Sequence, residues 1–267
     1  MPGGPQDSSK TRVKPVFDAL WKHGCEWLPA LLALPQFGAP GARVEINADL
    51  TLLEGYRGPG EKGLDPPVSL LSWLIRNLWT HNQSATAKDQ RRKLLLDGDP
   101  ETIRDALRLL RAEHRPRAWY VFEGLTYPDV FLVAKDAIVV IEGKRTEPGP
   151  ETHTKWLPGR HQIWRHIDAA WELRGRRAVY GFFIVEGDVQ DEGWSVPEVW
   201  RAAAADTVSA DALRSSFPHR SEEEAQAISS CFLGITTWRR VCECFDIDWR
   251  QLPRTVGDSA PSVDDKL

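Results

Sequence analysis

The stretch YPDVFLVAKDAIVVIEGKR, residues 127 to 145, contains two short apolar runs that are bordered by charged residues. Residues 131–133 and 137–141 form these runs, and the polar pair Lys135 and Asp136 separates them. Runs of this length, rich in β-branched residues and broken by a short polar pair, predict a β-hairpin with its turn at the pair. In that register Asp129 lies opposite Glu142.

The charged residues at the ends of this hairpin are expected on one face of the sheet. Residues directly opposed across a hairpin share a face, and Lys144 follows Glu142 by two positions, so it points the same way. Two neighbouring carboxylates repel each other and favour a cation between them. Lys144 alone could be that cation, in a salt-bridge cluster at a strand end. Alternatively, the carboxylates hold a divalent metal such as Mg²⁺, and Lys144 assists a water or stabilises charge on phosphorus.

The spacing of these residues resembles a known motif. Pro128-Asp129, then twelve residues, then Glu142-Gly143-Lys144 is similar to the PD-(D/E)xK motif of the restriction-endonuclease-like nuclease superfamily. The resemblance implies that Asp129, Glu142 and Lys144 are catalytic. It also implies that Asp129, Glu142 and the backbone carbonyl of Gly143 hold Mg²⁺ or Mn²⁺, with a nucleic acid, most readily DNA, as the substrate.

The segments around the hairpin follow the order of elements in that superfamily. Residues 99–114 carry a capping Asp99, a Pro at the first helical position and apolar residues at helical spacing, which predicts a helix. Residues 118–124 and 178–187 read as strands, and residues 157–174 as a helix with one apolar stripe. We therefore expect an α/β fold with a restriction-endonuclease-like core, a mixed central sheet flanked by helices in the order αβββαβ, and additional N- and C-terminal helices.

Polar residues at the start of the 157–174 helix are candidates for binding phosphate. In several branches of the superfamily a Gln on this helix, often followed by Tyr, Arg or His one turn later, reaches the active site. Gln162, with Arg165 and His166 one turn on, is similar to that pattern. Arg160 lies beside them and extends a basic cluster, which favours an anion-binding edge. The other interpretation is a solvated helix face.

A further acidic residue completes the site in many members of the superfamily. Glu123 ends the predicted first strand and is the nearest candidate in sequence. A four-residue loop would place it on the face opposite Asp129, so only a longer connection or a bulge would bring it round. Glu101, in the first turn of the preceding helix, competes with it, although that residue could simply favour the helix dipole.

Composition and charge limit the class of protein. The chain has 267 residues, 42% hydrophobic content and a net charge of −4. The sequence shows no signal peptide and no apolar run long enough to span a membrane. We therefore expect a cytoplasmic protein with no membrane partner. The cysteines have no metal-ligand spacing and are expected to be free thiols. Residues 143–177 hold eight Lys and Arg against four Asp and Glu, a local basic excess that suits a phosphodiester substrate. The low overall basicity leaves a homodimer or a partner subunit open.

Outside the core the chain reads as mostly helical. We divide it into an N-terminal helical region (1–98), the nuclease core (99–187), a C-terminal helical extension (188–252) and a disordered tail (253–267). Helices are expected within 15–34, at 67–80 and 84–96, and at 198–204, 221–229 and 235–245, with a strand at 44–53 and disorder up to about residue 11. The sequence thus predicts a metal-dependent nuclease. The alternatives are an inactive nuclease-fold subunit that binds DNA or assembles with a partner, and an unrelated α/β protein with a salt bridge.

Overall fold

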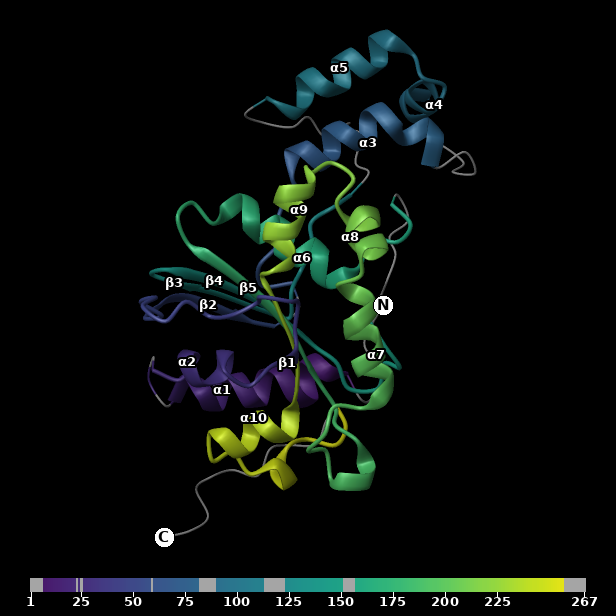
Figure 1. The fold of residues 1–267 in the computed structure, drawn as a ribbon. Coiled ribbons are helices and arrows are strands. Elements are labelled where there is room, and N and C mark those ends of the chain that lie inside the picture. Colours follow the sequence, from purple (N-terminus) through teal and green to yellow (C-terminus); the bar gives the residue numbers. More distant parts are fainter. Residues whose placement is uncertain are drawn as a thin grey trace.

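A six-stranded mixed sheet lies at the centre of the computed structural model, which describes residues 7–22, 24, 26–58, 60–81, 90–112, 123–150 and 157–256. The strand order across the sheet is β1-β6-β5-β4-β3-β2 (Figure 1). The strands are β1 (Gln36–Phe37), β2 (Leu52–Arg57), β3 (Val130–Ala134), β4 (Ala137–Gly143), β5 (Ala178–Val185) and β6 (Phe232–Thr237). The α/β class and the mixed central sheet flanked by helices are therefore confirmed.

The predicted hairpin is present in the predicted register. β3 and β4 are antiparallel, with Val130 opposite Ile141 and Val133 opposite Ile138, and the turn falls at Lys135 and Asp136. β5 then runs parallel to β4, and β6 runs parallel to β5. A parallel neighbour requires a crossover, and the helix α6 (Gln162–Leu173) supplies it between β4 and β5. The next pair beyond Val130 and Ile141 is Asp129 and Glu142.

Helices cover both faces of the sheet, and the strand residues alternate between two hydrophobic layers. One layer joins α1 (Lys14–Lys22), α2 (Leu28–Leu32) and α10 (Trp238–Cys244) to strand residues such as Leu132, Val139 and Phe182. The other joins α6, α7 (Glu198–Thr207) and α9 (Glu222–Ser229) to residues such as Val140 and Phe183 (Figure 1). A sheet buried on both faces explains why these strands read as continuous apolar runs.

A separate lobe of three helices lies beyond the sheet (Figure 1). It consists of α3 (Val68–His81), α4 (Gln90–Leu96) and α5 (Pro100–Leu110), packed around a small core of leucines. Asp99 caps α5 by accepting a hydrogen bond from the Thr102 N–H, as its sequence predicts. However, α5 was expected to be the first helix of the sheet core, and instead its buried residues belong to the lobe. The helix that comes before the three-stranded meander and packs on the sheet is α1.

The strand beside β3 also differs from the expectation. β2 pairs with β3, although the helical lobe α3–α5 lies between them in the chain. If α2, β1 and the lobe are left out, the order that surrounds the hairpin is α1, β2, β3, β4, α6, β5. The predicted strand at 118–124 lies mostly outside the described residues, and the strand expected at 44–53 begins only at Leu52. Because β1 and β2 come from the N-terminal region and β6 from the C-terminal extension, domain boundaries at 98 and 188 do not follow the sheet.

The C-terminal region contains a strand that was not predicted. Residues 235–245 were expected to form one helix, but Ile235 to Thr237 complete β6 and the helix α10 begins at Trp238. Thr237 caps α10 through its side chain, which explains where the strand ends and the helix starts. The capping box at Ser221 and Glu224 is present at the start of α9, as its sequence indicates. The helix α8 (Ala210–Ser216) precedes it.

The chain before α1 is folded against the sheet from residue 7 onward. Residues 9 to 13 form the π-helical turn η1 (Ser9–Val13), in which Thr11 and Val13 are fully buried. The expectation of disorder up to residue 11 is therefore wrong for the described part of this segment. At the other end, the described chain continues to residue 256, beyond the predicted start of the tail at 253. None of the helices in the described part of the chain has the length and apolar character needed to cross a membrane.

Candidate active site

The residues of the predicted motif meet where β3 begins and β4 ends. The Gly143 N–H donates a hydrogen bond of 2.9 Å to Asp129 Oδ2, and Lys144 Nζ lies 2.9 Å from Glu142 Oε1. Asp129, Glu142 and Lys144 are all buried, with exposed fractions of 8%, 4% and 9%. The hairpin register thus brings two carboxylates and an ammonium group together, as the sequence predicts.

The backbone at Lys144 is fixed by the neighbouring strand. Its N–H donates to Ile184 O, and its carbonyl accepts from the Glu186 N–H and from Trp238 Nε1. Since successive residues of a strand direct their backbone groups to opposite sides, the backbone carbonyl of Gly143 faces the β3 side, where Asp129 lies. A side chain at Gly143 would not fit, because a Cβ atom there would lie 2.6 Å from Val13 Cγ2.

Burial sets the protonation of the two carboxylates in opposite directions. Desolvation and the charge of Glu142 raise the pKa of Asp129 to about 8, despite hydrogen bonds from Gly143 and Ser9. Desolvation would also raise the pKa of Glu142, but His166 and Lys144 hold it below its usual value. Burial opposes the charge of Lys144, and the Glu142 carboxylate nevertheless raises the pKa of that amine. The site therefore has one firmly ionised carboxylate, Glu142, and one, Asp129, whose negative charge is disfavoured by burial and by Glu142.

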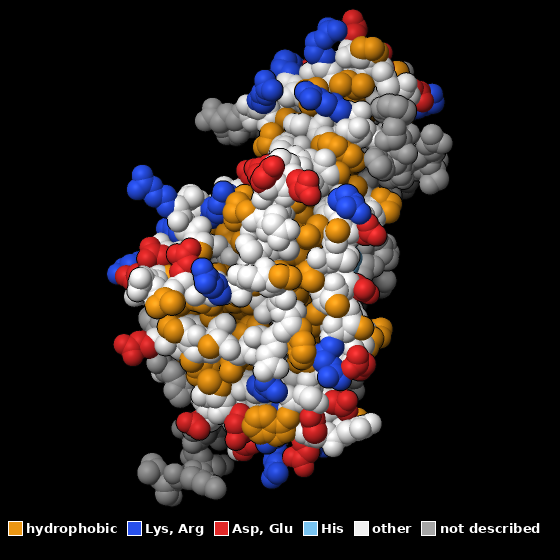
Figure 2. All heavy atoms as spheres, in the orientation of Figure 1, with side chains coloured by type: hydrophobic (Ala, Val, Ile, Leu, Met, Phe, Trp, Pro, Cys, Tyr) orange, Lys and Arg blue, Asp and Glu red, His pale blue; other side chains and the backbone are white. Residues whose placement is uncertain are grey.

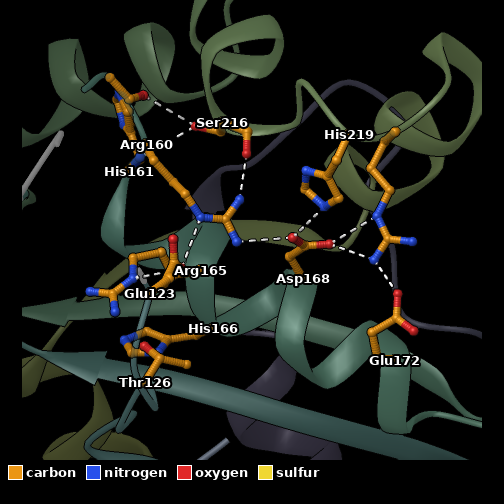
Figure 3. A network of polar contacts seen from close by, with 12 residues as sticks. Glu123, Thr126, Arg160, His161, Arg165, His166, Asp168, Glu172, Ser216 and His219 are labelled. Atoms are coloured by element: carbon orange, nitrogen blue, oxygen red, sulfur yellow. Dashed lines mark hydrogen bonds and ion pairs between the residues drawn. The ribbon is translucent and has the colours of Figure 1, made fainter. Parts of the chain in front are cut away.

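Gln162 and His166 bind Glu142 in this structure. Gln162 Nε2 donates to Glu142 Oε1 at 2.7 Å, and His166 Nε2 lies 3.1 Å from Glu142 Oε2. A carboxylate only accepts hydrogen bonds, so Nε2 of His166 carries a proton, and its Nδ1 faces Thr126 Oγ1 at 2.8 Å (Figure 3). Both residues were predicted to bind phosphate. His166 is buried behind Glu142 and positions that carboxylate instead, whereas the buried Oε1 of Gln162 has no hydrogen-bond partner among the described residues.

Arg160 and Glu123 belong to a separate buried network (Figure 3). Arg160 is fully buried and donates to Glu123 Oε1 at 3.1 Å, to Asp168 Oδ2 at 2.9 Å and to Ser216 O. Its predicted role as a phosphate ligand is wrong, because its guanidinium is enclosed and satisfied by these groups. Glu123 is directed at Arg160 and Arg165, so its contacts do not support the predicted catalytic role.

The same network ties α6 to the loop between α8 and α9. Asp168 accepts from Arg220 at 2.8 Å, and His219 Nε2 lies 3.1 Å from its other oxygen. Burial alone would raise the pKa of Asp168, but the surrounding His219 and Arg160 hold it far below the usual value. These polar groups are therefore structural, and they fix the helix that carries Gln162 and His166.

Arg165 keeps partial access to solvent. Its Nε lies 3.2 Å from Glu123 Oε1, and 23% of its side chain is exposed. Of the four residues predicted to bind phosphate, Arg160 and His166 are buried, whereas Gln162 and Arg165 keep partial access to solvent. Between Arg160 and Arg165, the two arginines of the predicted basic edge, only Arg165 is thus accessible to solvent.

Ser9 reaches the site from a segment that the sequence did not indicate. Its hydroxyl donates a 3.1 Å hydrogen bond to Asp129 Oδ1. Arg12 anchors the same turn through a two-bond pair with Glu186, at 2.9 and 2.8 Å. The polar, Gly- and Pro-rich N-terminus carries no local pattern that predicts these contacts. This turn therefore lies directly against the candidate site and contributes a hydrogen bond to Asp129.

The oxygen atoms that the site offers are suited to a divalent cation such as Mg²⁺. Each Asp129 oxygen accepts one hydrogen bond in the structure and retains further acceptor capacity. Hard oxygen donors suit Mg²⁺ and Mn²⁺, and Mg²⁺ commonly uses one or two carboxylates with water. Within the described ranges there is no cluster of three His, Cys, Asp or Glu residues that could hold a metal. The candidate set is therefore two carboxylates and the backbone carbonyl of Gly143.

A basic face lies on the helical lobe. Arg104, Arg108 and Arg111 are exposed and spaced four and three residues apart along α5 and its C-cap; we call them the α5 arginine face. Arg108 pairs with the partly exposed Asp105 at 2.6 Å, whereas Arg104 and Arg111 form no ion pair with any residue in the described ranges. Figure 2 shows Lys and Arg side chains gathered over this lobe.

Comparisons of the chain with models of protein families, with curated proteins and with solved structures found no match.

Proposed function

We propose that this protein is a metal-dependent nuclease that hydrolyses phosphodiester bonds, most readily in DNA. The observation that carries the proposal is the meeting of Asp129, Glu142 and Lys144 at the end of one hairpin, where both carboxylates are buried. The sequence resemblance to the PD-(D/E)xK superfamily assigns the same three residues to catalysis. The order α1, β2, β3, β4, α6, β5 is compatible with that family's core.

The residues of the chain have distinct roles in this proposal. Asp129, Glu142 and the Gly143 carbonyl would hold Mg²⁺ or Mn²⁺, which when bound supplies Lewis acidity toward the phosphate. Lys144 carries a buried positive charge next to Glu142 and is suited to stabilise negative charge that develops on the phosphate oxygens. Gln162 and His166 hold Glu142 in place, and Arg165 offers a cation to a neighbouring phosphate.

The α5 arginine face supports a nucleic acid as the partner. The chain as a whole has a net charge of −4, so binding a polyanion requires a local concentration of cations. Two of the three arginines have no ion pair among the described residues, and the third has a partner on the surface, where ion pairs contribute little. These side chains are therefore available to phosphates.

The Lys144→Ala variant tests the catalytic assignment. We expect cleavage of labelled DNA in Mg²⁺ to be abolished, while metal binding measured by calorimetry and DNA binding measured in EDTA persist. Lys135→Ala is the matched control, because Lys135 lies in the turn of the same hairpin and is paired with Asp49 at the surface. Full activity in the Lys144→Ala protein would show that the assignment is incorrect.

A second candidate function is a nuclease-fold subunit that binds nucleic acid without cutting it. The burial of Asp129, Glu142 and Lys144 to exposed fractions below a tenth favours this candidate, since a substrate must contact these side chains. Binding and cleavage assays distinguish the two functions. The inactive subunit would bind DNA in EDTA and would release no fragments in Mg²⁺ or Mn²⁺ on any substrate.

A further inference from the structure

A cavity of about 360 Å³ lies beyond the carboxyl end of β5, apart from the candidate active site. Its walls come from two distant segments, the loop that follows β5 and the C-terminal stretch around α10 and the short helix η3 (Trp249–Gln251). In Figure 1 these segments are the green loop and the yellow chain end below the sheet. The volume is at the small end of the range for ligand pockets and suits a ligand of mononucleotide size.

The charges that line the cavity leave an excess of cations. Glu186 is a lining residue, but both of its oxygens are bound by Arg12, so its charge is neutralised. The remaining charged lining residues are Arg239, Arg250 and Glu192. Arg250 is exposed and forms no ion pair within the described part of the chain. Two guanidinium groups therefore face one carboxylate, and an anion would be attracted.

Arg239 has a hydrogen-bond donor that none of the described residues satisfies. Its Nε is buried and has no hydrogen-bond partner in the described structure. The nearest carboxylate is that of Glu243, which is 3.8 Å from Nη2 and 58% exposed, so it compensates the guanidinium weakly. Most buried donors in proteins are paired, so the Nε of Arg239 is free to donate to an acceptor in the cavity.

The cavity also has an aromatic wall. The indole ring of Trp249 lines it, and the Arg12 guanidinium lies 4.8 Å from the centroid of that ring. Stacking on an aromatic ring stabilises nucleobases with little dependence on the base, because every base has a π-face. Two guanidinium groups and an indole in one cavity of this size form a combination that suits a phosphate attached to a planar base.

We propose that this cavity binds a nucleotide, with the phosphate on Arg239 and Arg250 and the base against Trp249. This site goes beyond the proposed nuclease activity and does not depend on it. Arg12 connects the two places, since it contacts Glu186 and Trp249 at the cavity and belongs to the turn that places Ser9 on Asp129. A nucleotide bound in the cavity would therefore be adjacent to the segment that covers the candidate active site.

Equilibrium binding of AMP, inorganic phosphate and adenosine to the full chain in EDTA tests the proposal. Calorimetry or the quenching of tryptophan fluorescence gives the Kd for each probe. We expect AMP to bind more tightly than phosphate, and adenosine to bind at least about tenfold more weakly than AMP, because it lacks the anion. Arg250→Gln should raise the Kd for AMP by about ten- to hundredfold, the usual effect of losing a charged hydrogen bond. Arg214→Gln is the control, since it removes an exposed arginine of α8 that pairs with Asp211 and does not line the cavity.

Three results would overturn the proposal: no detectable binding of AMP, equal binding of AMP and adenosine, or equal binding of AMP and inorganic phosphate. An unchanged Kd in both Arg250→Gln and Arg239→Gln would also refute it. Arg250 is exposed, so its variant is expected to fold normally even if the partly buried Arg239 variant does not. These measurements are made without metal and without cleavage, so their failure is distinct from failure of the nuclease assignment.

Discussion

Asp129→Asn is predicted to stabilise the metal-free protein, and to do so more strongly as the pH rises. The carboxyl has a pKa of about 8 in the folded chain and 3.8 as the reference value, a difference of roughly four units. Each unit corresponds to about 1.4 kcal/mol, so ionised Asp129 costs the fold up to about 6 kcal/mol above pH 8. The side chain is only 8% exposed, so solvent reduces this cost little.

The sign of the pH dependence follows from the protons bound. Between pH 4 and pH 8 the folded chain holds a proton on Asp129 that the unfolded chain has lost, so the free energy of unfolding falls as the pH rises. Asparagine cannot ionise and removes this slope. The difference in unfolding free energy between the Asn variant and the wild type should therefore increase by about 4 kcal/mol from pH 5 to pH 8.

Urea denaturation in EDTA at several pH values measures this difference. Ser9→Ala is the control, because it removes a hydrogen bond to Asp129 and leaves the buried carboxylate in place. Adding Mg²⁺ at pH 8 should stabilise the wild type by mass action and leave the Asn variant nearly unchanged. A constant difference in unfolding free energy between the wild type and the Asn variant from pH 5 to pH 8 would show that the pKa of Asp129 is not raised in the folded chain.

Four further outcomes are expected. His166→Ala leaves Glu142 without a positioning partner and should weaken Mg²⁺ binding about ten- to hundredfold by calorimetry; an unchanged affinity would exclude the positioning role. Glu123→Gln leaves Arg160 incompletely paired and should lower the unfolding free energy by about 3–5 kcal/mol, without an effect on Mg²⁺ affinity at a temperature where the variant is folded. Gly143→Ala should destabilise by about 1–3 kcal/mol in urea titrations, because its Cβ would overlap neighbouring side chains. Replacing all three residues of the α5 arginine face with Gln should weaken DNA binding. The slope of the logarithm of the binding constant against the logarithm of salt concentration should fall by about one unit for each phosphate that is no longer neutralised. An unchanged slope would show that the DNA binds elsewhere on the protein.

The hairpin and its register could be predicted because the information is local. Two β-branched runs and a polar pair between them fix the turn, and the turn fixes which residues face each other. For this reason the sequence predicts that Asp129 lies opposite Glu142, and the structure agrees. The capping residues of α5 and α9 are local signals of the same kind.

The neighbours of the hairpin could not be predicted in this way. The segment LLEGYR of β2 contains Glu54 and Gly55 and lacks a clear alternation, although Gly55 leaves space that Trp21 of α1 fills. The α5 periodicity identifies a helix but not the surface that it packs on. β6 includes Gly234, which has a positive φ of 106°. Glycine adopts this conformation readily, but a glycine in the sequence does not indicate a strand.

The buried polar network was missed because its members are far apart in sequence. Glu123, Arg160 and Asp168 each resemble a solvent-facing charge when the chain is read residue by residue. Their burial depends on Ser216 and the α8–α9 loop, which the fold brings onto α6. Sequence periodicity reports which face of a helix is apolar, but it does not report which charges a distant loop will cover.

Cleavage of labelled single- and double-stranded DNA by the wild type and by Asp129→Ala, in Mg²⁺, Mn²⁺ or EDTA, tests the central claim most directly. The proposed function predicts fragments with metal, none in EDTA and none with the Asp129→Ala protein. Fragments that form equally with Asp129→Ala, or a wild type that neither cuts DNA nor binds metal, would contradict it and return Asp129, Glu142 and Lys144 to a structural salt-bridge cluster.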